Sequence, residues 1–168
     1  MIQIRKMTMV TIVVFFTSIT GRVNGQVSEE YIKLKEMIGK PAPEFTVKDI
    51  NGKDFSLFSL RGKYVILDFW GTWCSACIKA FPKIKQFYTA NRDEFEIVGI
   101  AFDCKLEAWR KDVLEKHSLP WINVFDDISI IHKYNVTFAP MYFLIDKYGI
   151  IVDLPGFDDD GNLKRLYQ

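Results

Sequence analysis

The sequence contains few cysteines and histidines, the side chains that form most structural zinc sites. Its 168 residues include three cysteines and two histidines, and outside the pair Cys74 and Cys77 these residues stand alone, as Cys104, His117 and His132. A structural zinc site usually takes four ligands from two closely spaced pairs. The chain offers one such pair, so the sequence predicts no metal site and no bound cofactor. A metal-carrying binding module stays open as an alternative.

A strong excess of either charge is also missing. The 22 basic and 21 acidic residues give a formal net charge of +1, which gives no reason to expect a nucleic-acid partner. Hydrophobic residues make up 49% of the chain, enough to build the core of one domain. Three cysteines are too few for a disulfide-rich scaffold, and their odd number leaves at least one thiol outside any internal pairing.

No acidic residue occurs before Glu29, which sets the beginning of the chain apart. Two basic residues precede an apolar run over residues 7–20, and small residues stand near position 25. This pattern is typical of a secretory signal peptide, and the run is short for a membrane span. We expect residues 1–25 to be a cleaved signal peptide or, alternatively, an uncleaved anchor, which would then make the only membrane contact. Either way, the protein is expected in the periplasm or in another exported location.

After a lead-in over residues 26–40, residues 41–168 predict a single domain of the α/β class. Strand and helix patterns alternate, which indicates a mixed sheet between helices. An alternating stretch around Asn51 and Gly52 predicts a β-hairpin before the first long strand. The expected strands span residues 63–69, 94–102, 121–125, 141–146 and 150–156. The expected helices span residues 75–90, 105–117, 128–134 and 162–167, and residues 28–38 are expected to form a short helix or an ordered lead-in.

The two paired cysteines lie in the stretch ILDFWGTWCSACIKAFP, between an apolar strand pattern and a helix pattern. At the start of a helix, free amide groups and the helix dipole stabilise the thiolate of Cys74. Cys77 follows one turn later on the same side, where it can attack a mixed disulfide on Cys74. A disulfide that closes so short a loop adds little stability. The pair is therefore predicted to be redox-active, with Cys74 exposed and Cys77 shielded.

The segment DFWGTWCSAC, followed by Pro82, resembles the active-site segment of the thioredoxin superfamily. The wider pattern is similar to exported TlpA-like and ResA-like thiol-disulfide oxidoreductases, from IGKPAPEFTVKDINGKDFSL through EIVGIAFD to YNVTFAPMYFLID. This similarity covers residues 38–156. It implies a thioredoxin-like fold with a central mixed β-sheet flanked by helices and an N-terminal β-hairpin extension.

The resemblance also implies roles for individual residues. Cys74 matches the attacking cysteine and Cys77 the resolving cysteine. Pro140 matches the cis-proline beside the disulfide, and the backbone of Ala139 before it would receive an extended segment of a client protein. Trp73 would line the contact surface. The alternatives are a packed aromatic for Trp73 and an ordinary trans proline for Pro140.

Asp68 matches a buried acid beneath the cysteine pair. A carboxyl group in a strand that is buried on both faces is expected to have a raised pKa. It would accept the proton of Cys77 during resolution, or else serve only as a structural acid. Two positions depart from the family: Ala80 replaces a common glutamate, and Cys104 follows the strand where an acid or glycine is more usual. Cys104 is either an apolar core filler or a third thiol that modulates the pair.

These observations predict an exported thiol-disulfide oxidoreductase that exchanges disulfides with client proteins, in the direction of reduction as the resemblance implies. The alternatives are an oxidant that installs disulfides and, in another class, the metal-carrying module. The expected partners are client proteins and an upstream electron donor, membrane-bound or soluble. A peroxiredoxin would need the motif P-x-x-x-T-x-x-C, and Thr72 stands too close to Cys74 for it. The sequence leaves the reduction potential, the clients and the oligomeric state open.

Overall fold

The structure of the protein is a computed structural model that describes residues 29–126, 128–157 and 163–165. The expected signal peptide and the first residues of the lead-in lie outside the described residues. In the described part, no helix is long and apolar enough to cross a membrane.

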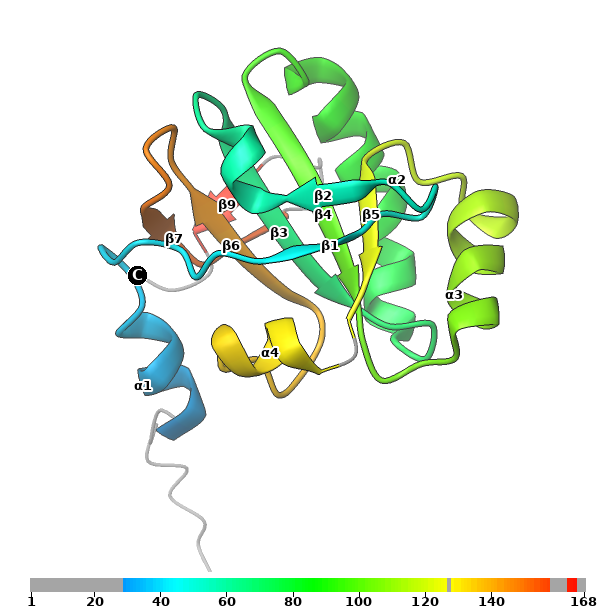
Figure 1. The fold of residues 1–168 in the computed structure, drawn as a ribbon, viewed down its shortest axis with the longest axis horizontal. Coiled ribbons are helices and arrows are strands. Elements are labelled where there is room, and N and C mark those ends of the chain that lie inside the picture. Colours follow the sequence, from blue (N-terminus) through cyan, green and yellow to red (C-terminus); the bar gives the residue numbers. More distant parts are fainter. Residues whose placement is uncertain (1–28, 127, 158–162, 166–168) are drawn as a thin grey trace, which may run out of the picture.

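The centre of the molecule is a five-stranded mixed sheet (Figure 1), as predicted. The strand order is β5-β4-β3-β6-β7, so the strand that leads into the cysteine pair, β3, lies in the middle. β3 pairs in parallel with β4 and antiparallel with β6. The strands span β3 Tyr64–Trp70, β4 Phe95–Ala101, β5 Ile122–Phe125, β6 Met141–Ile145 and β7 Ile151–Asp153.

The predicted hairpin is present at the beginning of the domain. β1 Thr46–Lys48 and β2 Asp54–Ser56 pair antiparallel, with Gly52 at a φ of +79° in the turn. The Asp49 carboxylate accepts hydrogen bonds from two backbone amides of this turn, those of Asn51 and Lys53. A bridge between Asp49 and Val124 attaches the hairpin to β5, an edge strand of the sheet. The hairpin therefore protects an edge that would otherwise be open to other chains.

Helices lie on both faces of the sheet, and most of them coincide with the expected ranges. They are α1 Glu29–Lys35, α2 Ser75–Asn91, α3 Leu106–Lys111 and α4 Ser129–Lys133, with a 3-10 turn at Leu57–Leu60. The expected single helix over residues 105–117 is instead α3 followed by a π-helical turn at Asp112–Lys116. Because a π turn is wider, the 3.6-residue period does not continue through it. In the π turn, Val113 is buried and Leu114 is exposed.

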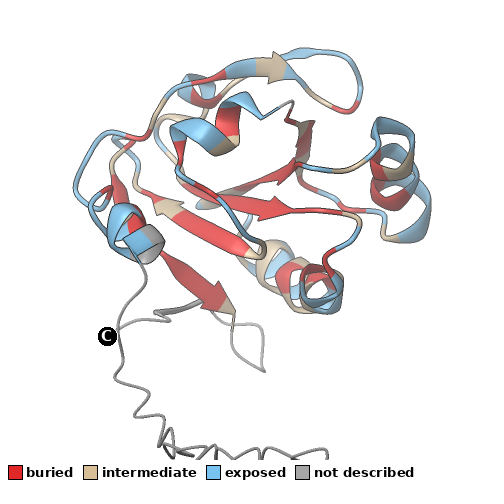
Figure 2. Ribbon diagram, turned by 90° about the horizontal axis from the view of Figure 1, so that it is seen from below, coloured by how far each residue is buried: buried red, intermediate tan, exposed pale blue. Residues whose placement is uncertain are grey.

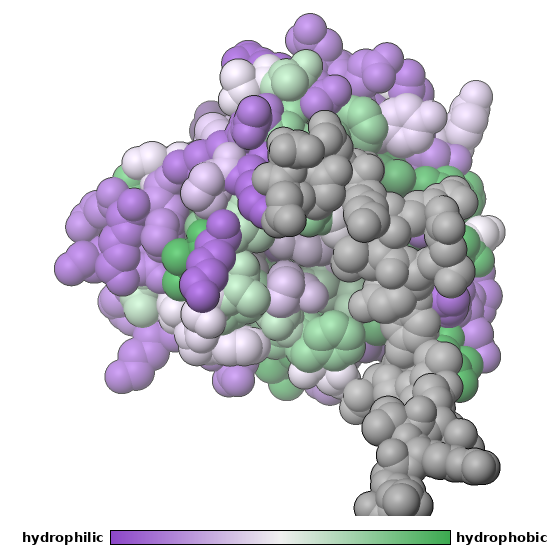
Figure 3. Space-filling model, turned by 180° about the vertical axis from the view of Figure 1, so that it is seen from behind, coloured by the Kyte–Doolittle hydropathy of each residue, from purple (hydrophilic) through white to green (hydrophobic). Residues whose placement is uncertain are grey.

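Two hydrophobic clusters fill the two sides of the sheet. The first cluster packs the hairpin, α1 and α4 against residues such as Leu67 and Phe69 of β3. The second cluster packs α2 and α3 against Ile66 and Trp70, the alternate residues of the same strand. Figure 2 shows the strands as a buried layer between more exposed helices. Seen from behind, hydrophilic residues cover much of the surface that is not grey, and apolar residues form smaller areas between them (Figure 3).

The end of the chain differs from its prediction. Instead of a helix over residues 162–167, β9 Leu163–Arg165 pairs antiparallel with β8 Pro155–Phe157. β8 contacts β6 and α2, so this small sheet extends the molecule next to the cysteine-bearing helix. The short pattern of apolar and basic residues at the end of the chain fits a helix as well as a strand. The strand forms because it pairs with β8.

Candidate active site

Cys74 and Cys77 form a disulfide at the junction of β3 and α2. Cys74 is the N-cap residue of α2, and its sulfur accepts a hydrogen bond from the backbone amide of Cys77 at 3.1 Å. The two Cα atoms lie 5.3 Å apart. A helix start offers amide donors to a negative charge on Cys74. The local sequence therefore places a sulfur atom where a thiolate would be stabilised.

Both sulfur-bearing residues are buried in the disulfide form. Cys77 is 1% exposed, as predicted, but Cys74 is only 4% exposed, so the prediction that Cys74 is exposed is wrong for this state. Both cysteines belong to the second hydrophobic cluster, in which the start of α2 packs against the sheet. A position at a helix N-terminus therefore did not imply exposure, because the helix begins within the packed core. A client must approach this disulfide through the residues around it.

Trp73 forms the most prominent exposed surface beside the cysteines. Its side chain is 50% exposed, and its ring meets Phe102 edge-on with 5.8 Å between ring centroids. A Cβ atom at Gly71 would lie 2.5 Å from Nε1 of Trp73. The indole can therefore lie close to the loop backbone only because residue 71 is glycine. Trp73 directly precedes Cys74 in the sequence, and its contact with clients stays a prediction.

The loop before β6 forms the other side of the site. The peptide bond between Ala139 and Pro140 is cis, and both residues are partly buried. A cavity of about 270 Å³ begins at Pro140 and runs along the exposed side of α2. Its wall includes Ala76 on α2, together with the aromatic rings of Tyr142 and Phe157. A groove with apolar walls and the two lysines Lys79 and Lys83 therefore lies next to Pro140 and reaches Ala76, which stands between the two cysteines in the sequence.

Asp68 is buried in the central strand β3. Its side chain is 1% exposed, and neither carboxylate oxygen has a hydrogen-bond partner in the part of the chain that the structure describes. This burial raises the pKa of Asp68 to about 7, as the sequence predicts. On β3, Asp68 shares a face with Ile66 and Trp70, and these two belong to the same cluster as Cys77. A carboxyl group that titrates near neutral pH therefore lies on the cysteine side of the sheet.

Cys104 is the third thiol, and it lies near the active-site loop. The residue is partly buried at the border of the second cluster. Burial raises the pKa of the Cys104 thiol, and hydrogen bonds from the backbone and the hydroxyl of Thr72 partly oppose this effect. Thr72 precedes Cys74 by two residues. Cys104 is thus neither a fully buried core filler nor part of the disulfide, but a neighbour of the loop that carries Cys74.

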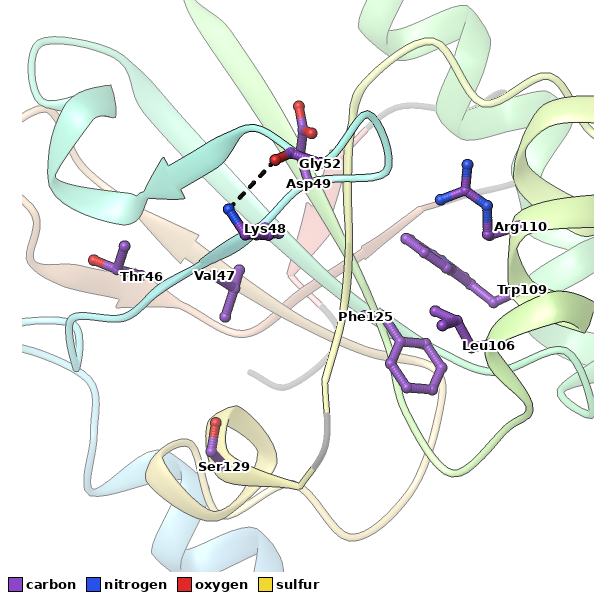
Figure 4. A pocket seen from close by; sticks show the side chains of 10 residues that line it. All are labelled: Thr46, Val47, Lys48, Asp49, Gly52, Leu106, Trp109, Arg110, Phe125 and Ser129. Atoms are coloured by element: carbon purple, nitrogen blue, oxygen red, sulfur yellow. Dashed lines mark hydrogen bonds between the residues drawn. The ribbon is translucent and has the colours of Figure 1, made fainter.

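A larger cleft, of about 510 Å³, lies away from the cysteines between the hairpin, β5 and α3. Figure 4 shows its side chains, with Lys48 and Arg110 on opposite sides. Lys48 is paired with Asp54 at 2.9 Å, and Arg110 donates to the carbonyl of Ile50 at 3.0 Å. These contacts tie the hairpin to itself and to α3. The cleft contains none of the predicted site residues.

Among the described residues, no three or more histidine, cysteine, aspartate or glutamate side chains are grouped as metal ligands would be. His117 lies against the ring of Phe81, with 5.2 Å between ring centroids, and His132 is exposed on α4. The two histidines therefore lie on different elements and do not converge on the cysteine pair. The arrangement of the site is that of a dithiol-disulfide centre.

A C-x-x-C disulfide between a central strand and the next helix, on a thioredoxin-like fold, defines the class of thiol-disulfide oxidoreductases. Comparison with known proteins agrees with this class. The model of the AhpC/TSA family matches residues 38–154, and the chain belongs to this family.

Individual relatives point to the same activity. The chain is 38% identical over 123 residues to the thiol-disulfide oxidoreductase ResA of Bacillus cereus, an alignment that covers 72% of this chain and 70% of that protein. It resembles the crystal structure of the thioredoxin domain of a Bacteroides vulgatus thiol-disulfide oxidoreductase, with a TM-score of 0.68 and 34% identity over 73% of this chain and 91% of that one.

A second similar structure is the crystal structure of a secreted disulfide oxidoreductase of Mycobacterium tuberculosis. The TM-score is 0.59 and the identity 32%, over 64% of this chain and 79% of that one. These similarities and the disulfide together show that the protein is a redox enzyme acting on thiols or disulfides.

Sequence reasoning missed Tyr142, which borders the groove and pairs directly with Asp68 across the sheet. Tyr142 is part of an apolar strand pattern and stands two residues after Pro140. The spacing from Pro140 could have placed it near the site, because alternate residues of a strand share a face. Its pairing with Asp68 depends on the register of β3 and β6, which the sequence pattern does not contain.

Proposed function

We propose that the protein is an exported reductant of disulfides in client proteins, and that it works through Cys74 and Cys77. The observation that carries this proposal is the Cys74–Cys77 disulfide at the start of α2, between the exposed Trp73 and the loop at Pro140. The arrangement has one sulfur at a helix N-terminus and a second sulfur one turn deeper, which suits sequential attack and resolution.

The first step is attack by the thiolate of reduced Cys74 on a client disulfide. A bond forms between Cys74 and one client sulfur, the client disulfide breaks, and the other client sulfur leaves as a thiolate. The backbone amide of Cys77 already donates to the Cys74 sulfur in the disulfide form. The same amide would stabilise the negative charge of the thiolate before attack.

The second step is resolution of the mixed disulfide by Cys77. The Cys77 thiol gives its proton to the Asp68 carboxylate, and its sulfur then attacks the sulfur of Cys74. The bond between Cys74 and the client breaks, and the client leaves as a thiolate. A base with a pKa of about 7 is suited to this transfer, because it is partly ionised at neutral pH and still accepts a proton.

Client segments are proposed to bind in an extended conformation beside Ala139 and Pro140. Trp73 supplies an exposed aromatic surface on one side, and the groove of about 270 Å³ supplies apolar walls on the other. An extended segment next to a strand can add its own backbone hydrogen bonds to those of the protein. Because the disulfide is buried, loosely structured clients fit this approach better than a rigid surface does.

Export is proposed from the basic and apolar pattern of residues 1–25, acting as a signal peptide or as an anchor. The domain that follows is proposed to begin at residue 41, after a lead-in over residues 26–40. Reduction of clients consumes electrons at the pair, so an upstream electron donor, membrane-bound or soluble, must reduce the Cys74–Cys77 disulfide again. An oxidoreductase outside the cytosol needs such a donor because its surroundings favour disulfides.

The test is insulin reduction by the purified mature domain with a dithiol donor, together with trapping by Cys77→Ser. We expect turnover with the wild-type chain, and mixed disulfides with Cys77→Ser but none with Cys74→Ser. A reduction potential near those of cytosolic reductants supports the reducing direction, and a potential near those of strong periplasmic oxidants supports disulfide installation instead. Stoichiometric metal uptake without thiol turnover would contradict both directions.

A further inference from the structure

Four strands of the sheet place their residues in one row beneath α2. Asp68 pairs with Tyr142 of β6 on one side and with Gly99 of β4 on the other. Gly99 pairs in turn with Asn123 of β5. Paired residues of neighbouring strands share a face of the sheet. The row therefore lies on the side of the sheet that carries Cys77 and the second hydrophobic cluster.

Gly99 has no side chain in this row, and two polar side-chain atoms from β5 and the segment before it approach its backbone closely. A Cβ atom at Gly99 would lie 2.9 Å from Oδ1 of Asn123 and 2.9 Å from Nε1 of Trp121. The side-chain nitrogen of Asn123 donates to the carbonyl of Trp121 at 2.6 Å, so Oδ1 is the atom turned toward the glycine. A hydrogen-bond donor and an acceptor thus meet above Gly99, next to Asp68 on the neighbouring strand.

The polar side-chain atoms of the residues around Gly99 are buried and unpaired in the described part of the chain. In the part of the chain that the structure describes, neither oxygen of Asp68 forms a hydrogen bond, and the same holds for Nε1 of Trp121 and Oδ1 of Asn123. Buried polar side-chain atoms in proteins nearly always have a protein or water partner. A buried water molecule typically makes about three hydrogen bonds. One indole donor and two kinds of acceptor around a glycine provide the required partners.

We propose that a buried water molecule lies above Gly99 and bridges these three groups. It accepts a hydrogen bond from Nε1 of Trp121 and donates to Asn123 and to the carboxylate of Asp68. Trp121 and Asn123 are then positioning residues for the proton transfer from Cys77, an inference that rests on the proposed function. Neither of them touches the reacting sulfur atoms in this assignment.

The proposed water affects the protonation of Asp68. A hydrogen bond donated to Asp68 favours its ionised form, and the ionised form is the one that accepts the proton of Cys77. Among the described residues, Tyr142 of β6 is a titratable neighbour whose pKa Asp68 affects, and Cys77 of α2 belongs to the same cluster as Tyr142. β4 and β5 contribute the neutral residues of the row. On α2, Lys79 and Lys83 line the groove that Tyr142 borders.

Two other unpaired indoles provide a comparison. Nε1 of Trp70 is also buried and unpaired, but Trp70 pairs with Ala101 of β4, where a side chain occupies the position that Gly99 leaves open. Nε1 of Trp109 is likewise buried and unpaired, on α3 within the same cluster. Trp109 is therefore a matched control for the removal of an indole N–H away from Gly99.

The experiment compares Trp121→Phe with Trp109→Phe in single-turnover reduction of a client disulfide between pH 5 and 9. Both variants lose a buried N–H and keep an aromatic ring. Trp121→Phe is expected to move the acid side of the pH profile for resolution upward by about one pH unit, because it removes the donor that holds the water on the carboxylate. Trp109→Phe is expected to leave that midpoint in place.

Equal profiles for wild type and Trp121→Phe would overturn the inference. If Trp121→Phe does not fold, a high-resolution crystal structure of the wild-type protein decides instead. An ordered water bonded to both Asp68 and Trp121 supports the inference, and direct packing without such a water overturns it. Asp68→Asn tests the proposed role of Asp68 separately from the proposed water. If it leaves resolution unchanged, the proposed role of Asp68 is wrong, whatever the position of the water.

Discussion

Asp68 on β3 and Tyr142 on β6 are direct partners in the antiparallel ladder at the centre of the sheet. The carboxyl group is buried, whereas the tyrosine borders the groove beside Pro140. Burial, and to a lesser extent the nearby Asp68 carboxylate, raise the pKa of Tyr142, so the phenol stays neutral at physiological pH. This pair connects the groove in which we place the client with the acid that we assign to resolution.

Asp68→Asn is expected to remove a pH-dependent loss of stability. Burial raises the pKa of Asp68 from 3.8 in the unfolded reference to about 7. Well below pH 3.8 the carboxyl is neutral in both states, but between pH 3.8 and 7 it is ionised mainly in the unfolded chain, so stability falls as pH rises. The full loss above pH 7 is on the order of 4 kcal/mol.

Urea denaturation of the oxidised protein between pH 4 and 8 measures this effect. The free energy of unfolding of wild type should decrease over this range relative to that of Asp68→Asn. Tyr142→Phe is the control, since its phenol does not titrate in this range and Asp68 is kept. A constant difference between wild type and Asp68→Asn at every pH would mean that the carboxyl has an ordinary pKa.

Trp73→Ala is expected to weaken client reduction with little effect on folding. The side chain is 50% exposed and has an edge-on contact with Phe102, so its removal leaves the core intact. The ratio kcat/KM for insulin should fall by about tenfold, which corresponds to ~1.4 kcal/mol of binding energy in the transition state. The denaturation midpoint should change little.

Tyr148→Ala provides the matched control for Trp73→Ala. Tyr148 is an aromatic residue that is 84% exposed, and it lies in the turn between β6 and β7. Its removal should leave both insulin reduction and stability unchanged. Equal activity of the two variants would show that Trp73 does not contact clients and would favour the alternative given above, that it is only a packed aromatic.

The sequence predicted the parts of the fold that depend on local patterns. Asn51-Gly52 predicted the hairpin, the apolar run over residues 63–69 predicted the central strand, and the cysteine spacing predicted the redox-active pair. These features need only the turn preference of one dipeptide or the periodicity of one segment. The thioredoxin-like arrangement of the sheet followed from the resemblance, which the strand order confirms.

Other features depend on contacts between segments that are distant in sequence. The burial of Cys74 results from packing of the start of α2 against the sheet, and the strand at Leu163–Arg165 forms only by pairing with β8. The row through Asp68, Gly99 and Asn123 depends on the register of three strands. A single sequence contains no direct signal for register, because hydrophobic strands in a buried sheet lack a polar face that would mark it.

Cys104 is expected to react slowly and to be dispensable for exchange. In the oxidised protein it is the free thiol of the described residues, and burial raises its pKa, so little thiolate is present at neutral pH. Iodoacetamide should label it at less than roughly a tenth of the rate of an exposed thiol at pH 7, and faster as pH rises. Cys104→Ala should keep insulin reduction at the wild-type rate.

A different outcome is expected if Cys104 is a third thiol that modulates the cysteine pair. Thr72 bonds to its sulfur and lies two residues before Cys74. If Cys104 forms a transient disulfide with the active-site pair, Cys104→Ala should change the exchange rate severalfold, and mass spectrometry should detect the alternative disulfide in the wild-type protein. Either result would assign Cys104 to the third-thiol interpretation instead of to packing.

Ala76→Trp is expected to separate client binding from the chemistry of the cysteines. Ala76 is exposed on the first turn of α2 and lines the groove of about 270 Å³ next to Pro140 and Tyr142. A tryptophan there fills part of the groove without entering the core. Reduction of the Cys74–Cys77 disulfide by dithiothreitol should stay near the wild-type rate, because a small dithiol needs no groove. Insulin reduction should fall by about tenfold.

Gln86→Trp, on an exposed position near the far end of the same helix, should change neither rate. If Ala76→Trp reduces insulin as fast as wild type, clients do not use this groove, and the docking surface must lie on the Trp73 side alone.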